Sequence, residues 1–194
     1  LGLIGVIMAK RDVTLDGQDC IDIWQNAQRY GEIKAYFSEK ESDYPRLSGQ
    51  ASVIGDFSLV IHKIAQVFDQ NHQIRDNASV ELLRLRTRIS ELERQTKRYV
   101  HNVLQNKEYQ KYFQDALVTV RNNRYVIPVK QEYRHAFPGI VHDTSASGAT
   151  LYIEPMAIVS ANNDLQAARI AETREIEKIF RRLTALIAGD YENL

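Results

Sequence analysis

Four cations stand among aromatic residues between positions 121 and 134, in a pattern suited to contact with a polyanion. Guanidinium and ammonium groups bind the phosphates of a nucleic-acid backbone without reading its sequence. Tyr125 and Tyr133 lie beside the cations, where their rings would pack in a core or stack on bases. The segment predicts recognition of a nucleic-acid backbone, and its candidate phosphate contacts are Arg121, Arg124, Lys130 and Arg134.

Other kinds of site find little support in the residue pattern. His142, Asp143 and Ser145 form one contiguous polar run, whereas the partners of a hydrolase triad converge from distant positions, so we interpret the run as a hairpin turn. The five histidines show no zinc-binding spacing, and no phosphate-binding G-x-x-x-x-G-K-[ST] loop occurs. We therefore predict no catalytic residue, metal ligand or cofactor site within these residues.

The chain of 194 residues has 25 basic and 25 acidic residues, and this balance excludes a uniformly basic nucleic-acid coat. The charge is unevenly distributed, however, with a net charge of −4 over residues 1–83, +7 over 84–136 and −3 over 137–194. A basic block on a neutral chain attracts polyanions locally. The longest apolar run, Leu1 to Ala9, is too short to span a bilayer, and a lone cysteine, Cys20, agrees with a reducing compartment. We expect an intracellular protein with no membrane partner.

The hydrophobic pattern predicts a mainly α fold in which a helical core bundle continues into a long antiparallel coiled-coil lever. We expect a helical core over 1–77, a first lever helix over 78–116 and a returning lever helix over 155–194. Within the core, the pattern predicts a helix opening at Gln18 or Asp19, a loop over 38–48 and a second helix over 55–69. The lever helix, capped by Asn77 or Ser79, carries a heptad seam. Its positions are Leu82, Leu85, Ile89, Leu92, Thr96, Tyr99 and Val103.

Between the two lever helices, residues 117–154 have the two-residue alternation of strands. One predicted pair of strands flanks Asn122-Asn123, and another flanks the turn over 145–148. Pro128 should then lie at an edge or an irregularity, because proline cannot donate a ladder hydrogen bond. These features predict a small β-hairpin insert, shaped like a clamp, at the tip of the lever.

The insert contains two long runs, RNNRYVIPVKQEYR at 121–134 and GIVHDTSASGATLYIEP at 139–155, followed by Asn162-Asn163. Together they closely resemble the bacterial MutS2 family, the branch of MutS proteins that suppresses recombination. The resemblance implies a core, lever and clamp region that precedes an ATPase domain. Because the chain also begins at Leu1 rather than Met, we expect it to be part of a longer protein.

The resemblance further implies the activity and partners of that parent protein. It would be a homodimeric ATPase with a Smr nuclease domain, acting on branched or duplex DNA in the bacterial cytosol or nucleoid, with ribosomal RNA on stalled ribosomes as a further target. ATP and Mg would belong to the missing ATPase domain, and the present region would contribute only motion and nucleic-acid binding. The alternative is a structural coiled-coil module that mediates dimer or ribosomal-protein contacts without binding nucleic acid.

Overall fold

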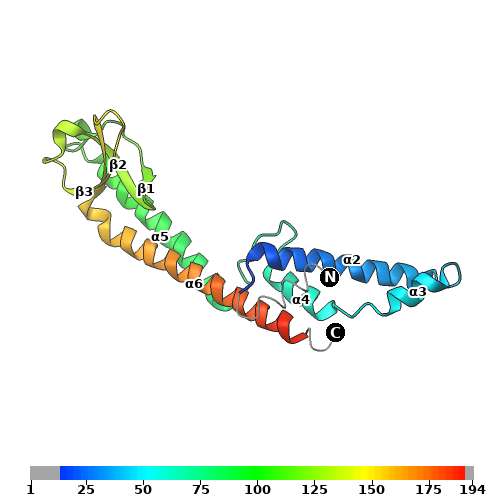
Figure 1. The fold of residues 1–194 in the computed structure, drawn as a ribbon. Coiled ribbons are helices and arrows are strands. Elements are labelled where there is room, and N and C mark those ends of the chain that lie inside the picture. The colour runs from blue at the N-terminus through cyan, green and yellow to red at the C-terminus, as the bar shows by residue number, and fades with distance from the viewer. Residues whose placement is uncertain (1–13, 191–194) are drawn as a thin grey trace. The chain divides into compact units, whose positions relative to one another are not determined.

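The computed structural model describes residues 14–190, which form two compact units (Figure 1). Unit 1 contains residues 14–83 and 174–190, and unit 2 contains residues 84–173. The described chain is mainly helical and carries one small antiparallel sheet, which confirms the predicted mainly α class with a β insert. The apolar run from Leu1 to Ala9 lies outside the described residues.

Three helices form most of unit 1: α2 (Gly17–Glu39), α3 (Pro45–Ser52) and α4 (Ser58–Val67). α2 begins earlier than predicted, because Asp16 caps it by accepting a hydrogen bond from the backbone N–H of Asp19 at 2.8 Å. α3 occupies part of the segment predicted as a loop. Its first residue is Pro45, whose fixed φ suits the first turn of a helix.

Apolar side chains from α2, α4 and the C-terminal half of the last helix fill the core of unit 1. Ile21, Ile64 and Leu183 are representative members, and the ring of Phe180 packs over Gly17 at 3.3 Å from where a Cβ would stand. Cys20 lies in this core, where burial, aided by the charges of Asp19 and Asp16, raises the pKa of its thiol to about 12. The thiol therefore stays protonated and behaves as an apolar group.

Two long helices, α5 (Val80–Gln105) and α6 (Val159–Asp190), run side by side in opposite directions (Figure 1). In unit 1, Ser79 caps α5 through the backbone N–H of Leu82, as predicted, and donates its hydroxyl to Glu175 of α6 at 2.8 Å. In unit 2, two ion pairs cross between the helices in antiparallel order. They are Arg86 with Glu172 at 2.9 Å and Glu93 with Arg169 at 2.6 Å.

The predicted heptad seam is followed as far as Thr96 and is wrong at Tyr99, although Val103 packs against the core of unit 2. Tyr99 is 43% exposed, whereas the neighbouring Val100 and Leu104 are buried. The spacing of buried residues thus changes from alternating three- and four-residue steps to repeated four-residue steps. The reason is that Val100 and Leu104 pack in a core that also includes the sheet, so this end of α5 faces a broader apolar partner than one helix.

The insert is a four-stranded antiparallel sheet in the order β1-β2-β4-β3. The strands are β1 (Thr119–Arg121), β2 (Arg124–Lys130), β3 (Gly139–Thr144) and β4 (Thr150–Pro155). Asn122 and Asn123 both have positive φ, at 50° and 61°, as a tight two-residue hairpin requires. Both predicted strand pairs are present. Pairing between β2 and β4, which the sequence did not indicate, joins them into one sheet.

The sheet packs against α5 and the start of α6 to form the core of unit 2, with β2 buried along most of its length. Pairing between β1 and β2 ends at Val126, so Pro128 lies beyond the end of β1. Short 3-10 helices precede and follow the strands at Gln110–Tyr112, Gln131–Tyr133 and Met156–Ile158. The second of these directly continues β2 and carries the chain toward Arg134.

Candidate nucleic-acid interface

Arg124, the first residue of β2, is held by a polar network beside the sheet. Its Nη1 donates to Glu154 Oε1 at 2.8 Å, and its Nη2 donates to Asn163 Oδ1 at 2.7 Å. The side chain of Glu154 is fully buried, and a buried carboxylate needs a close cation to offset its loss of hydration. Arg124 is therefore committed to a contact that stabilises the unit.

Two further side chains complete this network around Glu154. Asn162 donates its amide to Glu154 Oε1 at 2.8 Å and also bonds both backbone groups of Tyr125. His142 Nε2 lies 2.5 Å from Glu154 Oε2, within hydrogen-bond distance. A β-bulge between Val141 and Asp143 makes His142 the extra residue of its strand, and such bulges redirect side chains.

Arg121, at the end of β1, is paired but still accessible. Its Nε lies 3.1 Å from Asp143 Oδ2, and its guanidinium carbon sits 4.1 Å from the centre of the Tyr152 ring. The side chains of Arg121 and Asp143 remain 36% and 47% exposed. An ion pair with this much exposure contributes little to stability, so exchanging the carboxylate for a phosphate costs little.

Lys130 and Arg134 have no carboxylate partner among the residues that the structure describes. Lys130 Nζ donates to the backbone oxygen of Lys111 at 3.3 Å, which fixes the side chain without neutralising its charge. Arg134 follows the 3-10 helix Gln131–Tyr133, and only its backbone is hydrogen bonded within the described chain. The structure thus separates the four predicted contacts into two cations that face carboxylates and two that do not.

The two tyrosines singled out from the sequence both pack against protein. Tyr125 is buried in the core of unit 2, with Lys97 Nζ 6.0 Å from its ring centre. The ring of Tyr133 lies against that of Tyr112, with 4.8 Å between centres. Both rings therefore contribute to packing within unit 2.

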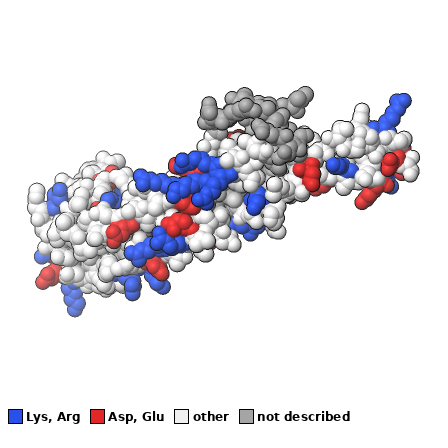
Figure 2. Space-filling view, turned by 90° about the horizontal axis from the view of Figure 1, so that it is seen from below, with Lys and Arg blue, Asp and Glu red and all other residues white. Residues whose placement is uncertain are grey.

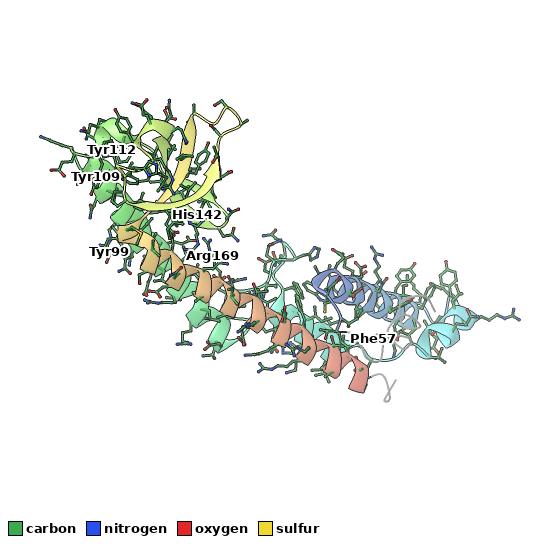
Figure 3. All side chains as sticks on the ribbon, turned by 60° about the vertical axis from the view of Figure 1, so that its left-hand side comes forward. Phe57, Tyr99, Tyr109, Tyr112, His142 and Arg169 are labelled. Carbon is green, nitrogen blue, oxygen red and sulfur yellow. The ribbon has the colours of Figure 1, made fainter. Side chains whose placement is uncertain are left out.

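Sequence reasoning missed a basic and aromatic segment that the fold brings beside Lys130. Residues 107–112, which include Tyr109 and Tyr112, follow α5 and pack on the sheet because Phe113 bridges to Val129. Figure 3 shows Tyr109 and Tyr112 close together beside the sheet, apart from Tyr99 and Arg169 on the helices. The signal in the sequence was the interleaving of Lys107, Tyr109, Lys111 and Tyr112.

The outer face of α5 carries a second group of cations. Arg94, Lys97, Arg98 and His101 recur at three- and four-residue steps and are exposed. They border an open hollow whose lining comes entirely from α5, so it is a space between neighbouring side chains rather than an enclosed cavity. Figure 2 shows Lys and Arg side chains gathered over the long helices with Asp and Glu between them.

The polar run at 142–145 does not form a hydrolase triad. His142 faces Glu154, Asp143 pairs with Arg121, and the hydroxyl of Ser145 accepts from the backbone N–H of Thr150 at 3.1 Å. The run is the end of a strand and its turn, in agreement with the interpretation from sequence. Within residues 14–190, no group of three His, Cys, Asp or Glu side chains is arranged to hold a metal ion.

Comparison with known proteins decides the family. The chain is 39% identical over 189 residues to the endonuclease MutS2 of a Geobacillus species, an alignment that covers 96% of the chain. It is 44% identical over 168 residues to the endonuclease MutS2 of Exiguobacterium sibiricum and 37% identical over 180 residues to that of Pelotomaculum thermopropionicum. The chain belongs to the MutS2 family. No family model matches it.

The match is to one region of these MutS2 proteins. The chain spans about a quarter of the length of the curated relatives, 24% for the Geobacillus protein and 21% for that of Exiguobacterium. The recognition made from the insert motifs is therefore confirmed. Among the described helices, none is both long and apolar enough to cross a membrane.

Proposed function

We propose that this chain is the nucleic-acid-binding core, lever and clamp region of a MutS2 protein. In this proposal α5 and α6 are the lever helices and the sheet of unit 2 is the clamp. Membership of the MutS2 family supports it, together with the +7 charge of residues 84–136, all of which belong to unit 2. The parent protein would be an ATP-driven homodimer of the bacterial cytosol or nucleoid. It would suppress recombination by acting on branched DNA and also meet ribosomal RNA on stalled ribosomes.

The observation that carries the proposal is the pair of cations at the end of β2. Lys130 and Arg134 face no carboxylate within the described residues, so a phosphate can approach them without breaking an ion pair. Arg121 would join by exchanging Asp143 for a phosphate. Arg124 would act mainly by holding the hairpin turn that positions Arg121, since its own guanidinium already has two partners.

ATP and Mg would bind outside these residues. The chain has no P-loop, and its described carboxylates are not grouped as metal ligands, so its residues do not fit a Mg-nucleotide. We therefore derive no catalytic step for this region. Its contribution would be to bind nucleic acid and to move with the ATPase domain.

Charge reversal at the end of β2 tests the proposal. We expect the double variant Lys130→Glu, Arg134→Glu to weaken binding of the full chain to a fluorescent duplex, a four-way junction and a ribosomal RNA fragment by at least about tenfold each. Fluorescence anisotropy measures the affinity. The matched control is Arg182→Glu, which reverses an exposed charge on α6 in unit 1 and should leave affinity unchanged.

The structural-module alternative draws support from Arg124, whose charge is used within the protein. Under that alternative, the double variant would bind every nucleic acid no more weakly than the unaltered chain does, while self-association, measured by analytical ultracentrifugation, would fail. That result would overturn the proposal. Preferential loss of junction or of ribosomal RNA binding would instead identify which of the two targets this surface serves.

A further inference from the structure

Three tyrosines of unit 2 pack their rings against the protein and have hydroxyls without a protein partner. Tyr109, Tyr112 and Tyr133 are each half-buried and pack against the core of unit 2. None of their phenolic oxygens has a hydrogen-bond partner within the described chain, and none is among its buried polar atoms without a partner. The three hydroxyls are therefore open donors at the surface.

The rings of these tyrosines already have protein neighbours. Tyr112 has Tyr133 at 4.8 Å on its ring and the ammonium group of Lys111 at 5.2 Å from its centre. Tyr109 meets Phe137 edge-on, with ring centres 5.3 Å apart, and lies 6.1 Å from Tyr112. These neighbours restrict the ring area left for a base, whereas the hydroxyls remain without a protein partner, so we take the hydroxyls as the groups that a ligand would meet.

Three lysines lie in the same segments as these tyrosines or reach those segments. Lys107 and Lys111 belong to the same segment as Tyr109 and Tyr112, and Lys130 reaches the backbone of Lys111. Within residues 14–190, none of these lysines forms an ion pair, although the exposed carboxylates of Glu108 and Glu132 stand in the same two segments. We call this set the tyrosine–lysine surface: Lys107, Tyr109, Lys111, Tyr112, Lys130 and Tyr133.

We propose that the tyrosine–lysine surface binds the phosphates of a nucleic-acid backbone through phenolic hydroxyl and ammonium donors, without stacking on bases. This inference rests on the proposed function and deepens it. It extends the contact from Lys130 to a segment that follows α5, and it defines the ligand as a phosphodiester chain of any base sequence. Tyrosine hydroxyls and lysines are among the donors that contact phosphate oxygens in protein complexes with DNA. Single strands and duplexes should both bind, because both present phosphates.

Tyr→Phe substitutions test this inference, because they remove the hydroxyl of each tyrosine and keep its ring. We expect Tyr109→Phe, Tyr112→Phe and Tyr133→Phe each to weaken binding of a fluorescent duplex to the full chain about threefold to tenfold, because each deletes one hydrogen bond to a charged acceptor. Thermal unfolding should change little, since phenylalanine preserves the packing. The matched control is Tyr36→Phe, an exposed tyrosine of α2 in unit 1, which should leave affinity unchanged.

Two further variants are expected to strengthen nucleic-acid binding rather than weaken it. Glu108→Gln and Glu132→Gln each remove a negative charge beside the surface and should tighten binding two- to threefold. Homopolymers of thymidine and of deoxyadenosine should bind with equal affinity, because the bases are not read.

The outcomes separate this inference from the proposed function. If the three Tyr→Phe variants bind as well as the unaltered chain while Lys130→Glu, Arg134→Glu binds weakly, the tyrosine–lysine surface is wrong and the proposed function stands. A strong preference for one homopolymer would mean that bases stack on the tyrosines, which would also overturn the inference. If the unaltered chain binds no nucleic acid at low salt, both fall.

Discussion

At the scale of single residues, Glu154 is where the polar contacts of the sheet converge. Arg124, His142 and Asn162 all bond its carboxylate, and they come from β2, β3 and the start of α6. A fully buried carboxylate that loses its charge leaves its cation partner poorly compensated. The network therefore stabilises the arrangement of strands on which the proposed interface depends.

We expect Glu154→Gln to lower the free energy of unfolding by about 2–4 kcal/mol, because Arg124 would lose its counterion in a site that is only 24% exposed to solvent. Urea denaturation measures the change. The matched control is Asp143→Asn, which breaks the more exposed pair with Arg121 and should cost less than about 1 kcal/mol. Equal losses in the two variants would show that burial does not set the strength of these pairs.

The sequence indicated which cations to consider but not which of them are free. Arg121 and Arg124 stand three residues apart with similar neighbours, yet their carboxylate partners, Asp143 and Glu154, lie on strands more than 20 residues away. Those partners depend on strand register, including the bulge at His142, which local spacing does not encode. For this reason Lys111 and Tyr112, which fold onto β2 from another segment, were also missed.

At the scale of elements, the helices and strands with strong hydrophobic periodicity were predicted from the sequence. The contacts that these elements make with one another were not. The long helices and all four strands follow from periods of 3.6 and 2 residues. α3 was missed because it is only eight residues long, follows a charged stretch and begins with a proline that suggested a loop. The seam of α5 shifted after Thr96 because the sheet, whose position the helix sequence does not reveal, selects Val100 and Leu104.

The close pairing of β3 with β4 requires a glycine at position 139. A Cβ on Gly139 would lie 2.5 Å from the backbone oxygen of Glu154 and would also clash with the side chain of Ile153. We expect Gly139→Ala to lower the free energy of unfolding by about 1–3 kcal/mol through overpacking, as measured by thermal or urea denaturation. Gly49→Ala, on an exposed position of α3 with no neighbour within 4 Å, is the control and should not destabilise the chain. An unchanged midpoint for Gly139→Ala would mean that the strands separate at no cost.

At the scale of the whole molecule, a formal charge of zero coexists with a basic unit 2. If Lys107, Lys111, Lys130 and Arg134 each meet a duplex phosphate, log affinity should fall with log salt at a slope of about −3.6. Replacing Lys130 and Arg134 should reduce the magnitude of this slope by about 1.8. Anisotropy titrations over a series of potassium chloride concentrations measure it. A slope near zero for the unaltered chain would exclude a contact dominated by phosphates.

The bulge at His142 has a consequence for how this chain behaves among many copies of itself. β3 is an outer strand of the sheet, and a regular outer strand offers its free backbone groups as a template for another chain. The extra residue interrupts the even spacing of those groups, and β1, the opposite outer strand, is only three residues long. Both edges are thus poor templates for pairing with another copy, so growth of the sheet by edge-to-edge addition of further chains is disfavoured.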